Sequence, residues 1–276
     1  GPVWWITTSA NGGSDSNDGS SSAPFLTVSK GTQMAASGDT IMVRAGTYTG
    51  SGYRGLNPGG INMVIMSESG AASTTLDANY GDRHFLIENG EDTTMQIIGF
   101  TFINGSTSSD GGSIFFNDWI GYPTNSAIIK DCVFRNNETT GSSASGGAIN
   151  VNNSSPIFRN CVIDGNSSIG YGGGVAVINS FSAPKFQNCT IINNDVSTAA
   201  GTGISANGGG IYVQQGTPVF VDCIIDSNTV TSGGQNGNGG GVFVDWFDNS
   251  GVNPVKFIRC FIRENNVIAW GTWEAN

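Results

Sequence analysis

Short apolar runs alternate with Asn, Gly and Ser along the second half of the chain, and they recur as one motif five times. Each copy has an apolar residue, a Cys, an Ile or Phe two positions later, an Asn five positions after the Cys, and then a Gly pair that opens another apolar run. The repeated positions are Cys132, Cys161, Cys189, Cys223 and Cys260, with Asn137, Asn166, Asn194, Asn228 and Asn265.

The distance from one cysteine to the next is 29, 28, 34 and 37 residues, so the motif is constant while the segments between copies vary in length. Self-similarity at such a period is typical of a solenoid with variable loops. The apolar runs, such as GGAINV and GGGIYV, are short and rich in β-branched residues, and the 42 glycines argue against a helical repeat. Each copy therefore predicts one turn of a β-coil.

Like residues at like positions let successive coils stack about 4.8 Å apart, with strands hydrogen-bonded between coils. Cys, Ile and Phe would then form ladders inside the solenoid, and the asparagines would form a ladder at a bend, where amides bond to turn backbone. We predict an all-β fold, a single-stranded right-handed parallel β-helix of roughly eight coils with a short N-terminal capping helix.

The N-terminal segment differs from the repeats. Residues 1–2, Gly-Pro, are typical of the remnant of a removed tag, and residues 3–40 predict an N-terminal cap. Within it, Phe25, Val28, Thr32 and Ala35 would share one helical face, and Gly38 would end the helix before a strand at 40–43. We expect residues 41–276 to form the β-helix, which would continue beyond Asn276 because a bare final coil exposes strand edges.

The charge balance limits the partners. The formal net charge of −10, from 11 Lys and Arg against 21 Asp and Glu, disfavours nucleic acid and anionic membranes. No apolar stretch reaches the 18 residues that would predict membrane insertion of this segment. We expect an extracellular or cell-surface location.

The five cysteines are predicted to be buried, reduced thiols that pack as small hydrophobic groups. Stacked parallel side chains point the same way and are poorly placed for disulfides, and the ladder lacks the His expected of most mixed metal sites. His84 is the only histidine, so a His-dependent triad is not expected.

Aromatic and acidic residues cluster in the loops that follow the Gly-pair strands. Stacked loops could make one surface of the kind that packs against sugar rings, while the alternative is that the aromatic rings fold back to cover the coil. The candidate ligand-binding residues are Asp118, Trp119, Tyr122, Phe181, Asp245, Trp246, Phe247 and Asp248.

Asp15, Asn17 and Asp18 have the composition of a calcium loop but not its spacing, so a turn held by Asx hydrogen bonds is favoured and calcium is the alternative. No other cofactor is expected. Recurring basic residues, Lys130 with Arg159 and Arg135 with Arg263, lie beside no obvious acid cluster, so no catalytic residue is predicted.

Two resemblances cover roughly residues 3–49 and 97–265. The Gly-Gly-Ala-Ile signal at 146–149 and the Phe-x-x-Asn signal at 134–137, with their later variants, resemble the repeats of polymorphic outer-membrane proteins, which are bacterial surface adhesins and autotransporter passengers. The opening segment from Trp4 to Gly50 is similar to that of many secreted bacterial β-helix proteins, including some polysaccharide lyases. Both resemblances imply a right-handed parallel β-helix, but neither supplies a catalytic residue.

The first functional hypothesis is a secreted or cell-surface β-helix module of a larger bacterial protein, acting in adhesion, surface structure or carbohydrate binding. Its partner would be an extracellular glycan or a protein on a host or neighbouring cell. The alternative is a polysaccharide lyase or glycoside hydrolase acting on an extracellular glycan. A pure spacer, whose active part lies beyond Asn276, is the third.

Overall fold

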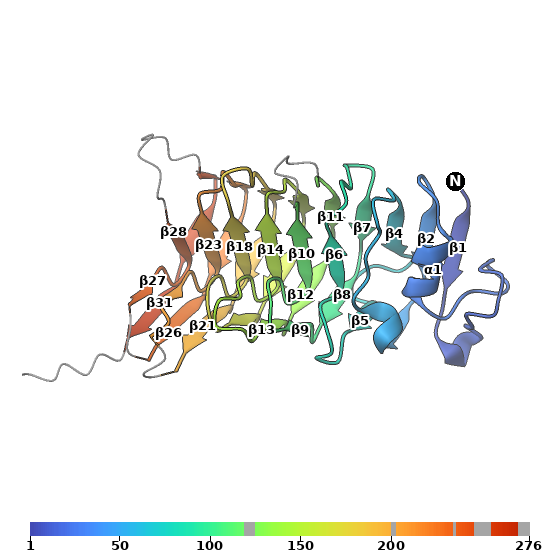
Figure 1. Ribbon diagram of the computed structural model, residues 1–276, viewed down its shortest axis with the longest axis horizontal. Coiled ribbons are helices and arrows are strands. Elements are labelled where there is room, and N and C mark those ends of the chain that lie inside the picture. The colour runs from blue at the N-terminus through green and yellow to red at the C-terminus, as the bar shows by residue number, and fades with distance from the viewer. Residues whose placement is uncertain (119–124, 200–202, 234–235, 246–254, 270–276) are drawn as a thin grey trace, which may run out of the picture.

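The computed structural model describes residues 1–118, 125–199, 203–233, 236–245 and 255–269, with the side chains of the last segment described to residue 268. The chain winds along one axis from the N-terminus, and successive coils lie side by side in a rod (Figure 1). Every ladder between named strands is parallel. The parallel β-helix expected from the repeats is confirmed.

Four faces form the wall of the solenoid, and we number them in the order in which one coil crosses them. Face 1 has nine strands: β1 (Val3–Ile6), β2 (Thr40–Val43), β4 (Val64–Ser67), β7 (Gln96–Ile98), β11 (Ile128–Lys130), β15 (Ile157–Arg159), β19 (Lys185–Gln187), β24 (Val219–Val221) and β29 (Lys256–Ile258). Face 2 has eight: β3 (Gly46–Thr49), β5 (Thr74–Asp77), β8 (Thr101–Ile103), β12 (Val133–Arg135), β16 (Val162–Asp164), β20 (Thr190–Ile192), β25 (Ile224–Asp226) and β30 (Phe261–Arg263).

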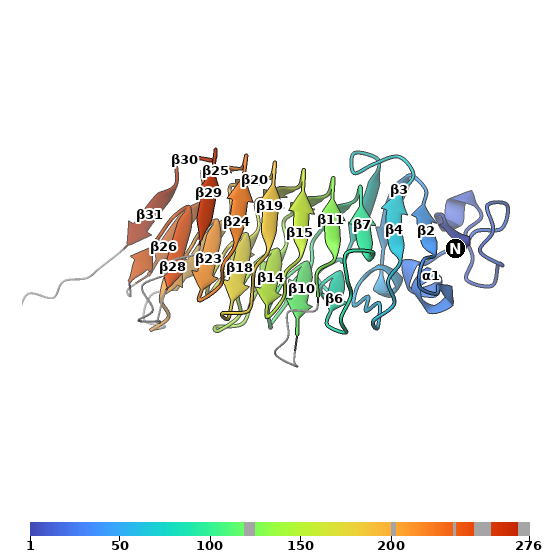
Figure 2. The ribbon, with the colours of Figure 1, turned by 90° about the horizontal axis from the view of Figure 1, so that it is seen from above.

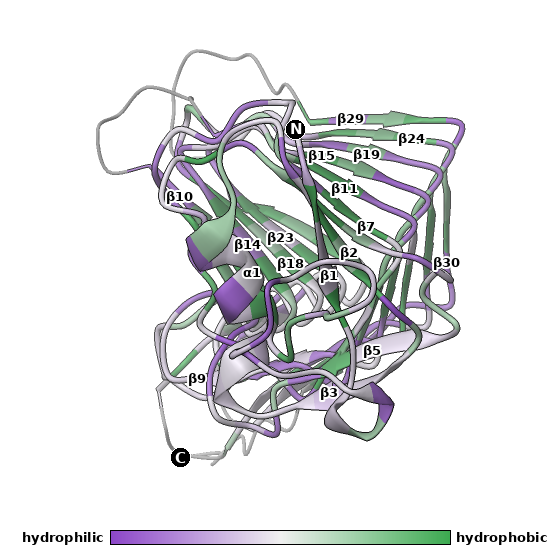
Figure 3. Cartoon of the chain, turned by 90° about the vertical axis from the view of Figure 1, so that its right-hand side faces the viewer, coloured by the Kyte–Doolittle hydropathy of each residue, from purple (hydrophilic) through white to green (hydrophobic). Residues whose placement is uncertain are grey.

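Faces 3 and 4 complete the later coils, and the faces are seen nearly end-on in Figure 3. Face 3 has six strands: β9 (Ser106–Thr107), β13 (Glu138–Thr139), β17 (Ser167–Ser168), β21 (Asp195–Thr198), β26 (Thr229–Ser232) and β31 (Asn266–Ala269). Face 4 has six: β6 (Phe85–Ile87), β10 (Ile114–Asn117), β14 (Ile149–Asn152), β18 (Val175–Ile178), β23 (Ile211–Gln214) and β28 (Val242–Asp245). A short pair, β22 (Ala206–Asn207) and β27 (Gly237–Asn238), lies beside face 3.

The solenoid has about six turns, fewer than the roughly eight expected. The difference lies at the N-terminal end, where face 1 already has strands β1, β2 and β4 before face 3 begins at β9. Those first coils run through loops and short helices instead of four strands, as the view from above shows (Figure 2).

The cysteine ladder is confirmed as part of the core. All five cysteines are free thiols, four of them buried and Cys260 half-buried. Each thiol lies within hydrogen-bonding distance of a carbonyl oxygen of its own coil and of one in the preceding coil, as Cys132 does for those of Lys130 and Ile97 at 3.2 and 3.7 Å, and its single proton can go to either. Burial raises the pKa of Cys132 to about 12, so this thiol stays protonated at neutral pH.

A second core ladder, at a motif position that the sequence predictions did not single out, runs beside the cysteines. Phe158, Phe186, Phe220 and Phe257 stand three residues before their cysteines, and each ring stacks on the next with centroids 4.6, 4.9 and 5.0 Å apart. The first copy has Ile129 at this position. Ring stacking in register adds to the apolar burial that holds neighbouring coils together.

The asparagine ladder is confirmed at a bend after face 2. From Asn166 onward, the Oδ1 atom of each Asn accepts hydrogen bonds from the backbone N–H and the side-chain amide of the Asn one coil earlier, at 3.0 and 2.9 Å for the pair Asn166 and Asn194. The same amide also donates to a backbone carbonyl, such as that of Phe134 for Asn166 at 3.1 Å. The residue before each Asn has positive φ at 54° for Asn136 and 55° for Asn193, which makes the corner sharp.

The Gly pairs are required by close packing between coils. A Cβ atom on Gly147 would lie 2.2 Å from the oxygen of Gly173, and one on Gly209 would lie 2.3 Å from the oxygen of Thr229. Both obstacles are backbone atoms of neighbouring strands or turns. No side chain fits where these backbones approach so closely.

The capping helix is confirmed, although it is shorter than expected. Helix α1 (Val28–Met34) lies across the N-terminal end of the rod, and the side chain of Thr27 caps it by accepting from the N–H of Lys30 at 3.0 Å. Val28 and Gly31 face the core, whereas Phe25 is buried ahead of the helix. Two 3-10 turns, η1 (Ser9–Asn11) and η2 (Ser51–Tyr53), complete this end. In the described parts of the chain, no helix has the length and apolarity that a membrane span requires.

Candidate functional site

A polar and aromatic groove of about 340 Å³ lies over the outer surface of face 4, across strands β14, β18, β23 and β28. We call it the Tyr171–Tyr212 groove. Its lining residues are Asp110, Ser143, Ser145, Asn150, Asn152, Tyr171, Ile178, Tyr212, Gln214 and Asp245.

A stack of aromatic rings forms one side of the groove. The rings of Tyr171 and Tyr212 are 4.8 Å apart and 25° from parallel, and Phe243 continues the stack 6.0 Å beyond Tyr212. Ala176, Tyr212 and Phe243 are partners in the strand register, so they occupy one outward position in three successive coils. Because Ala176 is small, the space one coil before Tyr212 is open, and the ring of Tyr171 fills it.

A relay of hydrogen bonds joins three residues at the other side of the groove. Asn150 donates through Nδ2 to the hydroxyl of Ser145 at 2.7 Å, and that hydroxyl donates to Oδ1 of Asp110 at 2.8 Å. The backbone N–H of Ser145 donates to the same carboxylate oxygen at 2.8 Å. The relay fixes which end of the Asn150 amide is the donor, because Ser145 has a single hydroxyl proton and gives it to Asp110.

Asp245 ends strand β28, and its carboxylate accepts a hydrogen bond from the hydroxyl of Tyr212 at 3.2 Å. Burial raises the pKa of Tyr212, and the neighbouring charge of Asp245 raises it further. Tyr212 therefore stays protonated at neutral pH and keeps its proton on the bond to Asp245. Its oxygen remains an acceptor for a ligand.

The two carboxylates of the groove belong to different coils. The backbone of Asp110 precedes β10 and that of Asp245 ends β28, four strands further along face 4, but their carboxylates bond to Ser145, in the coil of β14, and to Tyr212 on β23, which are two coils apart. Glycosidases use a pair of acids about 5 to 9.5 Å apart that face one sugar bond. The residues that line the groove also include no Lys, Arg or His to act as a base. The arrangement can stack on an apolar ring face and accept hydrogen bonds.

The candidate residues from the sequence are only partly brought together. Asp245 lines the groove, whereas Phe181 is 55% exposed away from it and the side chain of Asp118 is buried at the end of β10. Trp119, Tyr122, Trp246, Phe247 and Asp248 lie outside the described residues. The predicted loop surface therefore stays a prediction for those five.

Sequence reasoning missed Tyr171, Tyr212 and Asp110. Tyr171 and Asp110 each directly precede a Gly pair, and the residues at this position in successive coils form a row. The backbone of this row is hydrogen-bonded between coils; for example, the N–H of Gly146 donates to the carbonyl oxygen of Tyr171 at 2.8 Å. The position before the Gly pair is therefore the sequence signal that identifies Asp110 and Tyr171. Its members are Asp110, Ser145, Tyr171, Asn207 and Asn238.

The calcium candidates take part in the structure of their loop. Asp15 accepts from the backbone N–H groups of Leu26 and Thr27 at 3.0 and 2.9 Å, and Asp18 accepts from that of Ser20 at 2.9 Å. Asn17 donates to the carbonyl oxygen of Pro24 at 2.7 Å. Within the described part of the chain, no group of three His, Cys, Asp or Glu residues is placed to hold a metal ion. Calcium binding here stays a prediction.

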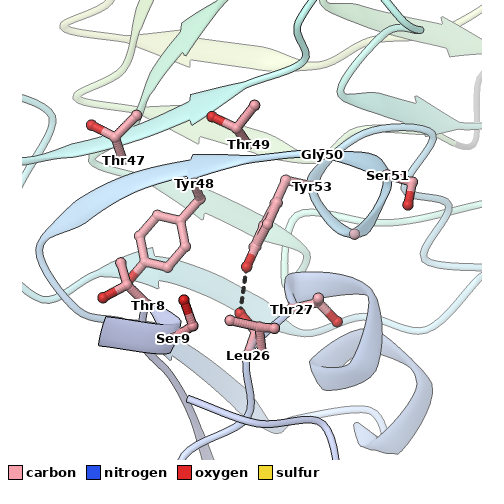
Figure 4. A pocket seen from close by; sticks show the side chains of 11 residues that line it. Thr8, Ser9, Leu26, Thr27, Thr47, Tyr48, Thr49, Gly50, Ser51 and Tyr53 are labelled. Atoms are coloured by element: carbon pink, nitrogen blue, oxygen red, sulfur yellow. Dashed lines mark hydrogen bonds between the residues drawn. The ribbon is translucent and has the colours of Figure 1, made fainter. Parts of the chain in front are cut away.

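A second hollow of about 500 Å³ lies in the seam between the N-terminal cap and the first coils (Figure 4). The hydroxyl of Tyr53 donates to the carbonyl oxygen of Leu26 at 2.6 Å, and the hydroxyl of Tyr48 donates to that of Arg44 at 2.7 Å. Burial raises the pKa of Tyr48 to about 12. Both tyrosines thus hold structural bonds, and the other polar side chains of the hollow are Ser and Thr hydroxyls, without the carboxylates of the Tyr171–Tyr212 groove.

His84 is a buried structural residue. Its Nε2 donates to the carbonyl oxygen of Leu76 at 3.0 Å, so its Nδ1 accepts from the hydroxyl of Ser113 at 3.0 Å. Burial lowers the pKa of His84 to about 4, which keeps the ring neutral. This ring packs edge-on against Phe102 with centroids 5.0 Å apart.

The comparisons with known proteins concern the fold. A family described as a protein of unknown function, DUF1565, matches residues 11–54, and no curated protein matches the sequence significantly. The structure of the pectate lyase Pel9A aligns with 100% of this chain and 81% of its own, at 14% identity and a TM-score of 0.52. A rhamnogalacturonan lyase aligns with 100% and 88% of the two chains, at 15% identity and a TM-score of 0.41. The chain shares the parallel β-helix fold of Pel9A.

Proposed function

We propose that the chain is a secreted or cell-surface β-helix module that binds carbohydrate in the Tyr171–Tyr212 groove. The observation that carries the proposal is the stack of Tyr171 on Tyr212 beside the carboxylates of Asp110 and Asp245. Aromatic rings pack on the apolar faces of sugars, and carboxylate and amide oxygens accept hydrogen bonds from sugar hydroxyls.

Binding without cleavage fits the groove better than catalysis. The lyase or hydrolase alternative requires a base or a close pair of acids, whereas the described lining has no Lys, Arg or His, and Asp110 and Asp245 bond to residues two coils apart. An extracellular setting suits a protein that meets polysaccharide, and a rigid solenoid is a suitable scaffold for display. Adhesion to a cell-surface glycan would use the same groove.

A glycan array probed with the purified chain tests the proposal, and each retained glycan is also checked for new reducing ends and for unsaturated products. We expect retention without cleavage. Cleavage of a retained glycan would favour the enzyme alternative, and retention of no glycan would contradict the proposed function.

Substitution then locates the site. We expect Tyr171→Ala to weaken binding of a retained glycan about tenfold, which corresponds to the loss of one aromatic contact. Tyr80→Ala is the matched control, because Tyr80 is 56% exposed on a different part of the surface. Phe181→Ala tests the competing loop surface. If Phe181→Ala weakened binding and Tyr171→Ala did not, the groove would be the wrong site.

A further inference from the structure

The Tyr171–Tyr212 groove contains a buried acceptor that has no donor. Asn150 is fully buried, and its Oδ1 has no hydrogen-bond partner among the described residues. Its Nδ2 is committed to Ser145, so the amide cannot turn to present a donor instead. A buried acceptor without a partner is costly, and a ligand could satisfy this one only if the side chains that cover Asn150 shift to admit its N–H or O–H.

The charged groups that line the groove are two acceptors, the carboxylates of Asp110 and Asp245. Asp110 and Asp245 each use one carboxylate oxygen in the hydrogen bonds within the described structure, at Ser145 and Tyr212. The hydroxyl proton of Tyr212 is directed to Asp245. Gln214, which is paired with Asp245 in the strand register, and the hydroxyls of Tyr171 and Ser143 are the lining groups that can donate to a ligand.

Positive charge is scarce at this surface. Burial lowers the pKa of Arg83, while the nearby charges of Asp82 and Asp110 raise it. Its guanidinium lies over the ring of Phe115, 5.2 Å from the centroid, and donates to the hydroxyls of Thr107 and Ser109. It is not among the lining residues of the groove, which leaves the two carboxylates there without a cationic partner in the lining.

We propose that the ligand of the groove is a glycan whose sugars carry free amino groups, an inference that rests on the proposed carbohydrate-binding function. An ammonium group donates three hydrogen bonds and carries the charge that complements Asp110 and Asp245. A uronate would bring a third carboxylate to the groove, where like charges repel.

Three hexasaccharides with one β-1,4 backbone isolate the amino group: glucosamine hexamer, N-acetylglucosamine hexamer and cellohexaose, which differ at carbon 2. Oligogalacturonate is the acidic probe. Calorimetry at low and at moderate salt measures each affinity with the unchanged chain. We expect glucosamine hexamer to bind at least about tenfold tighter than cellohexaose, with added salt narrowing the difference, and oligogalacturonate to show no binding.

Isosteric variants connect the preference to the groove. Asp110→Asn and Asp245→Asn keep the oxygens that accept from Ser145 and Tyr212, so we expect folding to persist and the affinity for glucosamine hexamer to fall about fivefold each. Glu264→Gln removes the same charge from an exposed position on the end coil and should leave that affinity within about twofold.

The outcomes separate the two proposals. Equal or tighter binding of cellohexaose, lost in Tyr171→Ala, would overturn the amino-sugar inference while keeping the carbohydrate site. Glucosamine hexamer could instead bind equally well to the Tyr171→Ala variant, or lose as much affinity in Glu264→Gln as in Asp110→Asn. Either result would show a general attraction to the acidic chain and would overturn both the amino-sugar inference and the carbohydrate site. Failure of glucosamine hexamer to bind would overturn the inference, and a different glycan retained through Tyr171 would then preserve the function.

Discussion

Replacing Asn194 with Ala tests what the asparagine ladder contributes to stability. The Oδ1 of Asn194 accepts from the backbone N–H and the amide of Asn166, and its own amide donates to Oδ1 of Asn228 and to the carbonyl oxygen of Ile163. The substitution removes these four hydrogen bonds, which lie at 2.9 to 3.0 Å, from a fully buried position.

The loss can be estimated from the bonds. A buried hydrogen bond contributes about 1 kcal/mol net, so we expect Asn194→Ala to lower the free energy of unfolding by about 4 kcal/mol. The backbone N–H of Asn166 and the oxygen of Ile163 would lose these partners where water has little access. Such a loss is a large part of the stability of an ordinary domain, about 5 to 15 kcal/mol.

Asn265→Ala is the matched control. Asn265 also makes four hydrogen bonds, with the backbone N–H and amide of Asn228 and the carbonyl oxygens of Ile225 and Arg263, but it is half-buried in the last described coil. Water can replace its lost bonds, so we expect a loss of about 1 kcal/mol. Urea unfolding measured by circular dichroism gives both values, if the slope of free energy against urea is unchanged.

Equal losses in the two variants would refute this reasoning, because the difference between them depends on burial alone. A loss below about 1 kcal/mol for Asn194→Ala would also refute it, and would mean that neighbouring groups find new partners.

Three further predictions concern other parts of the solenoid. The neutral, buried His84 has a pKa of about 4, against 6.5 in the unfolded chain, so the unfolded state binds the extra proton. The free energy of unfolding should therefore fall by about 3 kcal/mol as the pH drops from 6.5 to 4. In urea titrations, His84→Gln should remove that share of the pH dependence. Gly209→Ala should lower the free energy of unfolding by about 3 kcal/mol, because its Cβ would meet backbone oxygens 2.3 and 2.4 Å away. Gly203→Ala is the control, with φ of 67° and no atom within 4 Å, and should lower it by about 1 kcal/mol. Similar losses in the two variants would contradict the steric explanation. Under native conditions at pH 8, iodoacetamide should modify the half-buried Cys260 faster than the four buried thiols, as peptide mass spectrometry would show, and equal rates would mean that the whole ladder opens.

The fold was accessible from the sequence because it depends on a motif of constant spacing. Cys189 and Asn194 are five residues apart in their copy, as in every other, and stacking alone carries them into ladders. The phenylalanine ladder follows the same rule at Phe158 and Phe186, but Ile129 in the first copy obscured it. The number of coils was less accessible, because the N-terminal coils use turns where later coils use strands.

The groove could not be found in this way, because its residues come from different positions of the motif. Tyr171 precedes a Gly pair, whereas Tyr212 lies on β23, the face 4 strand of the next coil. Their contact depends on the small side chain of Ala176, which is the strand partner of Tyr212. That pairing is known only once the strands are aligned in the structure. Asp245 was found because it ends a strand beside a predicted loop, whereas Asp118 looked equivalent in sequence and is buried.

The asparagine ladder gives the rod a direction that restricts its symmetry. From Gly105 onward, every N–H in the ladder donates toward the next coil, as Gly105 does to Oδ1 of Asn137 at 2.9 Å, and no bond between ladder members in the described chain runs the other way. Two such rods placed end to end by a two-fold axis would bring donors against donors or acceptors against acceptors. The same bonds can continue only from head to tail, so any assembly that extends this ladder would be polar, like a filament, and not a closed symmetric pair.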